Sequence, residues 1–91
     1  MSLETKTLIC SSKTNPRKLA CAIRKELAKN KSVYVNAIGA KALNQAIKSC
    51  CYINDRSTLS ENQLPVHCYP RFAYHEMGDN KLGVMVRLEV R

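Results

Sequence analysis

The stretch that decides the fold is Val33-Tyr-Val-Asn-Ala-Ile-Gly-Ala-Lys-Ala-Leu-Asn-Gln-Ala-Ile-Lys48. Its apolar residues alternate as far as Ala37, which predicts a strand with both faces at least partly covered. After Gly39 they recur at helical spacing, which predicts a helix from Ala40 to Ile53. A strand that runs directly into a helix points backbone N–H groups and the positive end of the helix dipole outward, and this arrangement suits anions.

The residues on either side of this stretch predict a β-α-β-α-β-β order. Asn15 followed by Pro16 marks the start of the first helix, because Asn caps an N–H group and Pro is preorganised for the first turn. Pro65 and Pro70 interrupt the third strand, so we expect it at a sheet edge or with a bulge. The remaining predicted elements are a strand over 5–10, a first helix that stops near 30, a polar loop over 54–63, strands over 66–74 and 82–90, and a protruding hairpin tip near 77–81.

These elements form a single domain over residues 1–91 of the α+β class. A β-α-β beginning makes the first two strands parallel, and the closing hairpin adds antiparallel strands. We therefore expect a two-layer sandwich, with two helices on one face of a four-stranded mixed sheet.

The chain is strongly basic, with 15 Lys and Arg against 7 Asp and Glu, a formal net charge of +8. Such a surplus favours an anionic partner, most often nucleic acid, although charge that only keeps a small domain soluble is the alternative. No segment approaches the length of a membrane span, and the amino terminus lacks the apolar core of a signal peptide. We expect a cytoplasmic location, with nucleoid association as one option, and no membrane partner.

The five cysteines are predicted to be reduced and mostly buried, because their number is odd and no export signal accompanies them. A metal site is not expected, since the adjacent cysteines Cys50 and Cys51 diverge on a helix. A Cys68–His75 nucleophile would need a third orienting group and a pocket. We therefore predict no enzymatic activity, no cofactor, no metal and no small-molecule substrate.

Two segments resemble a known family. Leu8-Ile-Cys-Ser-Ser-Lys-Thr-Asn-Pro16 and Ala37-Ile-Gly-Ala-Lys-Ala-Leu-Asn-Gln-Ala-Ile-Lys48 resemble the stage V sporulation protein S family, which is similar in turn to the Alba chromatin proteins. The similarity extends from about Leu8 to Arg91. It implies an Alba-like fold, a homodimer and nucleic-acid binding, through a basic surface at the loop before the first helix and the start of the second, with two hairpin arms reaching along the duplex.

The resemblance also implies which side chains bind nucleic acid. They are Lys13, Arg17 and Lys18 at the first helix, Lys41 and Asn44 at the second, and Arg71, Lys81 and Arg87 on the hairpin arm. The chain departs from the family pattern at 50–52, where small aliphatic residues are expected, and in the acidic residues Glu76 and Asp79 of the hairpin.

Some roles stay open at this point. Gly39 either admits a phosphate or only permits the turn. Asn44 either contacts a phosphate or sugar, or makes a cap or an interhelix bond. Tyr74 mixes with basic residues of the hairpin, as in hairpins that bind nucleic acid. Alternatively, Phe72 and Tyr74 share a strand face, which is typical of a core or a dimer interface.

The predicted function is binding of the phosphate backbone of DNA or RNA with little sequence specificity, in a regulatory role like that of sporulation protein S. The alternative is a protein–protein interaction or regulatory module that does not bind nucleic acid.

Overall fold

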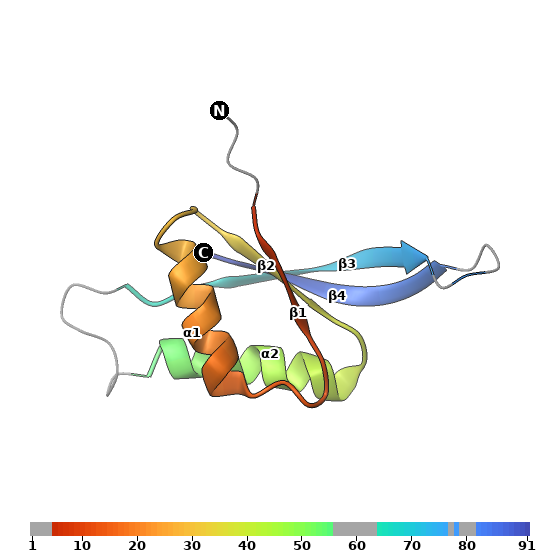
Figure 1. Cartoon of the computed structure of the whole chain (residues 1–91), viewed down its shortest axis with the longest axis horizontal. Helices are drawn as coiled ribbons and strands as arrows, with labels where there is room; N and C mark the ends of the chain where they lie inside the picture. Colours follow the sequence, from red (N-terminus) through yellow and green to blue (C-terminus); the bar gives the residue numbers. More distant parts are fainter. Residues whose placement is uncertain (1–4, 56–63, 77, 79–81) are drawn as a thin grey trace.

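The structure, a computed structural model, describes residues 5–55, 64–76, 78 and 82–91. The described elements are, in order, β1 (Thr7–Cys10), α1 (Pro16–Leu27), β2 (Val33–Ala37), α2 (Ala40–Ile53), β3 (Cys68–Glu76) and β4 (Leu82–Val90) (Figure 1). The predicted order and α+β class are confirmed. The predicted hairpin tip, apart from Gly78, and residues 56–63 of the predicted polar loop lie outside the described residues.

Element boundaries differ slightly from the predictions. The first strand begins at Thr7, two residues later than expected. The first helix ends at Leu27 with Ala28 as its cap, so Asn30 lies beyond the helix. The backbone N–H of Asn30 donates to the Glu26 carbonyl at 2.8 Å, which closes the last turn.

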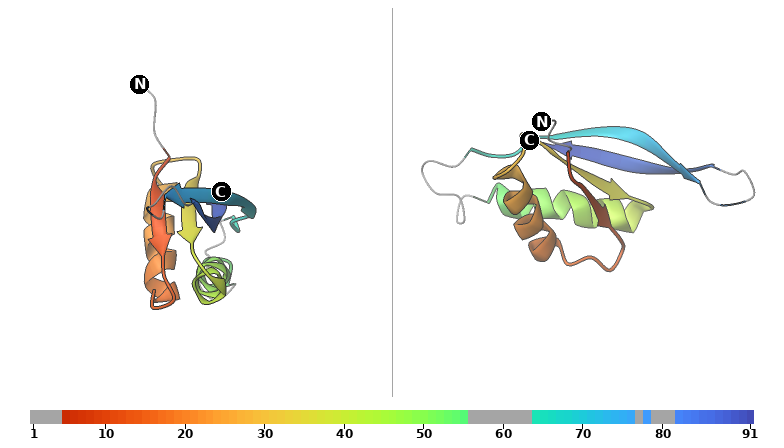
Figure 2. Two further views of the ribbon diagram at one scale, coloured as in Figure 1. Left: turned by 90° about the vertical axis from the view of Figure 1, so that its right-hand side faces the viewer. Right: turned by 45° about the horizontal axis from the view of Figure 1, so that its top comes forward.

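The four strands form one mixed sheet in the order β1-β2-β4-β3. The first two are parallel, and β4 pairs antiparallel with both β2 and β3. Both helices lie on one face of this sheet (Figures 1 and 2). Because β3 is an edge strand, Pro70 can sit within it without removing a hydrogen bond from the centre of the sheet, as its sequence predicted.

The core lies between the helices and the inner face of the sheet. Alternate residues of β2 and β4, which point to the same side, meet the apolar stripes of the two helices there. Its most deeply buried members include Ile23, Val33, Val35, Ala46, Ile53, Leu88 and Val90.

The two helices begin differently. The side chain of Asn15 caps α1, because its Oδ1 accepts from the N–H of Arg17 at 2.9 Å and of Lys18 at 3.3 Å. Gly39 precedes α2 with φ of 92°, a conformation that only glycine adopts without strain. Gly39 thus has a structural role in the turn between β2 and α2.

Replacing Asn15 with Ala should lower the free energy of unfolding by about 1 kcal/mol, because two N–H groups lose their acceptor. Chemical denaturation followed by circular dichroism measures this change. As a matched control, Asn44→Ala alters an exposed position inside α2 and should be neutral or slightly stabilising. Equal stability of the Asn15→Ala variant and the wild type would contradict the capping role.

Candidate nucleic-acid interface

The loop between β1 and α1 is fastened to the beginning of α2. Gln45 Nε2 donates to the Thr14 carbonyl at 3.2 Å, and Cys10 Sγ donates to the Ala42 carbonyl at 3.2 Å. Lys13 is exposed in this loop, and Lys41 is exposed one turn before Gln45 on the same side of α2. The structure therefore brings the loop of Lys13 beside the part of α2 that carries Lys41.

The amino end of α2 is open in a way that the amino end of α1 is not. Within the described part of the chain, no side chain caps α2, and its first turn contains Lys41 but no acidic residue. The first N–H groups of α1 already bond to Asn15. The amino end of α2 is therefore better placed to bind an anion than the amino end of α1.

Arg17, in the first turn of α1, lies beside the carboxyl end of α2. Its guanidinium carbon is 5.0 Å from the centre of the Tyr52 ring, near the end of that helix. Tyr52 follows Lys41 by eleven residues, about 16 Å along the axis. The helices cross, so the first turn of α1, with the exposed Lys18, is near the end of α2 rather than beside Lys41.

These placements define an elongated helix-side basic surface instead of a single cluster. Asn44 is exposed on α2 three residues after Lys41, on a neighbouring part of the helix surface. The members of this surface are Lys13, Arg17, Lys18, Lys41 and Asn44.

The two remaining described candidates lie elsewhere. Arg71 and Arg87 are paired across β3 and β4, on the face of the sheet opposite the helices. Arg87 Nε donates to Asn36 Oδ1 at 2.9 Å. Lys81, the third residue assigned to the hairpin arm, lies outside the described residues.

Sequence reasoning missed the partners that hold these arginines. The guanidinium carbon of Arg87 is 4.9 Å from the centre of the Tyr34 ring, and Arg71 forms a 2.9 Å ion pair with Glu89. Strict alternation in β2 already placed Tyr34 and Asn36 opposite the buried valines. It could not show which strand would lie next to them.

An exposed apolar patch lies on the other side of the hairpin. Phe72 is 70% exposed and Tyr74 64% exposed, and they pair across the strands with Val86 and Val84. The core interpretation of these two residues is therefore wrong, and the dimer-interface interpretation stays a prediction. The hairpin of β3 and β4 extends beyond α2 (Figure 1). A hollow lined by Leu43, Pro70, Phe72 and Val86 adjoins them. We call Phe72, Tyr74 and Val84 the apolar hairpin patch.

All five cysteines are free, but they are less buried than predicted. Cys21 and Cys51 are exposed. Cys50 and Cys68 join α2 to β3 through a hydrogen bond with 3.0 Å between the sulfur atoms. This bond lowers the pKa of Cys68 to about 7 from an ordinary value of 9.0, and burial opposes that shift. The pKa of Cys50 is raised by its hydrogen bond with Cys68 and by its burial.

Among the described residues, no group of three or more His, Cys, Asp or Glu side chains could hold a metal ion. No helix in the described ranges is long and apolar enough to cross a membrane.

Comparison with known protein families identifies the chain. The model of the family described as stage V sporulation protein S matches residues 6–91. The chain belongs to the stage V sporulation protein S family. A comparison with curated protein sequences gave no significant match. Membership in the stage V sporulation protein S family supports a sporulation-related regulatory protein.

Alkylation tests the Cys50–Cys68 pair. The rate at which iodoacetamide modifies Cys68 should rise with pH around a midpoint near 7, because only the thiolate reacts and its folded-state pKa is about 7. In a Cys50→Ala variant the midpoint should move up towards the ordinary value of 9.0. Peptide mass mapping separates Cys68 from the other four thiols. A midpoint near 9 in the unmodified sequence would contradict the assignment.

Proposed function

We propose that the protein is a homodimer that binds the phosphate backbone of nucleic acids through the helix-side basic surface. The observation that carries this proposal is the bond between Gln45 and Thr14, which holds a lysine-bearing loop against the uncapped, lysine-bearing start of α2. The family resemblance points to the same two segments. A sporulation-related regulatory role would follow from binding of this kind.

Phosphate recognition here needs only charge and backbone donors. A phosphate at the start of α2 would accept bonds from the first N–H groups of the helix, whose dipole favours negative charge. Lys41 and Lys13 would neutralise that phosphate and its neighbour, and release their counterions. Arg17 and Lys18 would engage phosphates farther along, since α1 meets the other end of α2.

Contacts of this type position a nucleic acid but carry no sequence information. Lysine ammonium groups meet the phosphates of DNA and RNA in the same way. We therefore expect similar affinities for duplexes of different sequence. The strength of binding should depend mainly on ionic strength.

The apolar hairpin patch supports the dimer. Large aromatic side chains that stay in solvent do not gain the favourable free energy of burial. Exposed apolar patches of this kind are typical of contact surfaces. A second copy would cover Phe72 and Tyr74 and would double the basic surface. The same patch also favours the alternative function, a protein–protein interaction module that does not bind nucleic acid.

Charge reversal tests the binding surface. A double substitution, Lys13→Glu with Lys41→Glu, should weaken binding to duplex DNA by at least about 10-fold, because two phosphate contacts become repulsive. Fluorescence anisotropy at several salt concentrations measures affinity, and the wild type should lose affinity steeply as salt rises.

A matched control is available at the end of α1 and in the turn that follows it. Lys25→Glu with Lys29→Glu makes the same change in net charge at exposed positions away from the loop. It should weaken binding much less. Equal losses of affinity in the two double variants would show that only net charge matters. If the wild type did not bind duplex DNA at low salt, the alternative function would be favoured.

Sedimentation velocity tests the dimer. Phe72→Ser with Tyr74→Ser should convert a dimer to a monomer, because the patch loses its apolar area. Ile9→Ser serves as the control, since Ile9 is equally exposed but lies on the opposite face of the sheet. A wild-type monomer at high concentration, or a dimer that survives the double substitution, would contradict this interface.

A further inference from the structure

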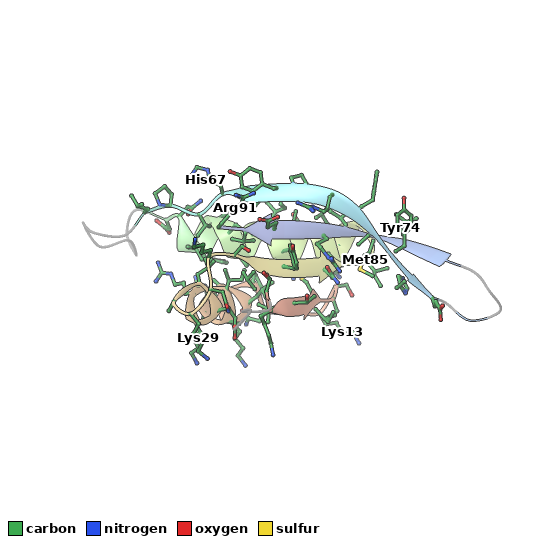
Figure 3. All side chains as sticks on the ribbon, turned by 90° about the horizontal axis from the view of Figure 1, so that it is seen from above. Lys13, Lys29, His67, Tyr74, Met85 and Arg91 are labelled. Atoms are coloured by element: carbon green, nitrogen blue, oxygen red, sulfur yellow. The ribbon has the colours of Figure 1, made fainter. Side chains whose placement is uncertain are left out.

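The sheet face opposite the helices carries an ordered set of tyrosines and arginines. We name it the open sheet face and define it by Tyr34, Asn36, Tyr69, Arg71, Arg87, Glu89 and Arg91. Among the described residues, no helix lies over it, and Figure 3 views the molecule from this side, with Arg91 labelled.

Strand register places these side chains in two rows across the sheet. Asn36, Arg87 and Arg71 are successive partners on β2, β4 and β3. In the next row Glu89 stands between Tyr34 and Tyr69. Two strand spacings separate the two tyrosines, about 10 Å. One row thus carries two arginines, and the next row carries two tyrosines with a carboxylate between them.

Each tyrosine carries a stacked guanidinium. Arg87 lies over Tyr34 with 4.9 Å from its guanidinium carbon to the ring centre, and Arg91 lies over Tyr69 at 4.4 Å. Such pairs are attractive because the ring face is negative. A guanidinium is planar, so a planar group such as a base can stack on a face that the tyrosine ring does not cover.

Hydrogen bonds and an ion pair hold these arginines in place. The amide oxygen of Asn36, a residue only 7% exposed, accepts from Arg87. Glu89 Oε1 accepts from Arg71 at 2.9 Å, and Glu89 Oε2 forms a 2.9 Å ion pair with Arg91 Nε. One carboxylate therefore orients two guanidinium groups. Each guanidinium has five N–H donors, so a single bond to Glu89 leaves others for a phosphate.

The open sheet face brings like charges together. Arg71 and Arg87 face each other directly across two strands, a pairing of like charges that is unfavourable. Three arginines and one glutamate leave the face positive. A positive surface of fixed, stacked planar groups is complementary to a polyanion with planar, unpaired bases.

We infer that the open sheet face binds single-stranded nucleic acid. Unpaired bases stack on Tyr69 and on the guanidinium faces of Arg87 and Arg91, and phosphates bond to Arg71 and Arg91. This inference rests on the proposed nucleic-acid binding but assigns it a second surface and a preference for unpaired strands. A duplex cannot use these stacks, because its bases are already paired and stacked.

The experiment compares three labelled 12-residue strands by fluorescence anisotropy: oligo(dT), oligo(U) and an abasic strand with the same phosphates. The wild type should bind both base-bearing strands at least about 5-fold more tightly than the abasic strand, the lower end of what one base stack contributes. Oligo(dT) and oligo(U) separate DNA from RNA as the source of the bases.

Two variants locate the site. Tyr69→Leu, at a half-exposed position, should remove the preference for base-bearing strands and leave duplex affinity unchanged. Arg91→Gln should weaken the binding of base-bearing strands more than Lys25→Gln does. Lys25→Gln is the control, because it removes one positive charge from α1. Amide and Arg Nε–H NMR signals of the open sheet face should shift with oligo(dT) and not with duplex.

The outcomes separate this inference from the proposed function. Equal affinity for abasic and base-bearing strands, with normal duplex binding, would overturn the inference alone. A base preference that survives Tyr69→Leu, or a Tyr69→Leu variant that also loses duplex binding, would overturn it as well. A base preference without duplex binding would support the inference and overturn the helix-side site. If the wild type were oligomeric and Tyr69→Leu made it monomeric, the open sheet face would be a protein–protein interface instead.

Discussion

The burial of β2 on both of its faces is the constraint on which the rest of the structure depends. Val33 and Val35 point into the core, where α1 and α2 cover them. On the other face Tyr34 and Asn36 lie beneath Arg87. The strand also pairs with β1 along one edge and with β4 along the other. A shift of register by one residue would exchange the two faces and bury Tyr34 in the core.

This constraint explains which features the sequence could predict. The helix over Ala40–Ile53 and the cap at Asn15 depend on neighbouring residues, and both are confirmed. Alternation in β4 predicted the last strand for the same reason. The sequence assigns Lys13 and Lys41 to the segments at the starts of the two helices. The structure brings these segments together through the bond between Gln45 and Thr14.

Features that depend on pairing between distant segments could not be predicted. The crossing of α1 over α2 places Arg17 at Tyr52, and local periodicity carries no information about a crossing angle. The bond between Arg87 and Asn36 joins residues fifty-one positions apart. The exposure of Phe72 depends on how far the hairpin extends past α2, a property of two elements and not of one strand.

The hairpin shows why one domain has two distinct surfaces. Alternation along β3 directs Phe72 and Tyr74 towards the helix side and Arg71 towards the open side. A partner that covers the apolar hairpin patch would therefore leave the arginines of the open sheet face in solvent. Glu89 is ion-paired with both Arg71 and Arg91, whereas Arg87 is held by the Tyr34 ring and the Asn36 amide oxygen. Dimerisation through one side of the hairpin and recognition of a polyanion on the other are thus compatible within the same two strands.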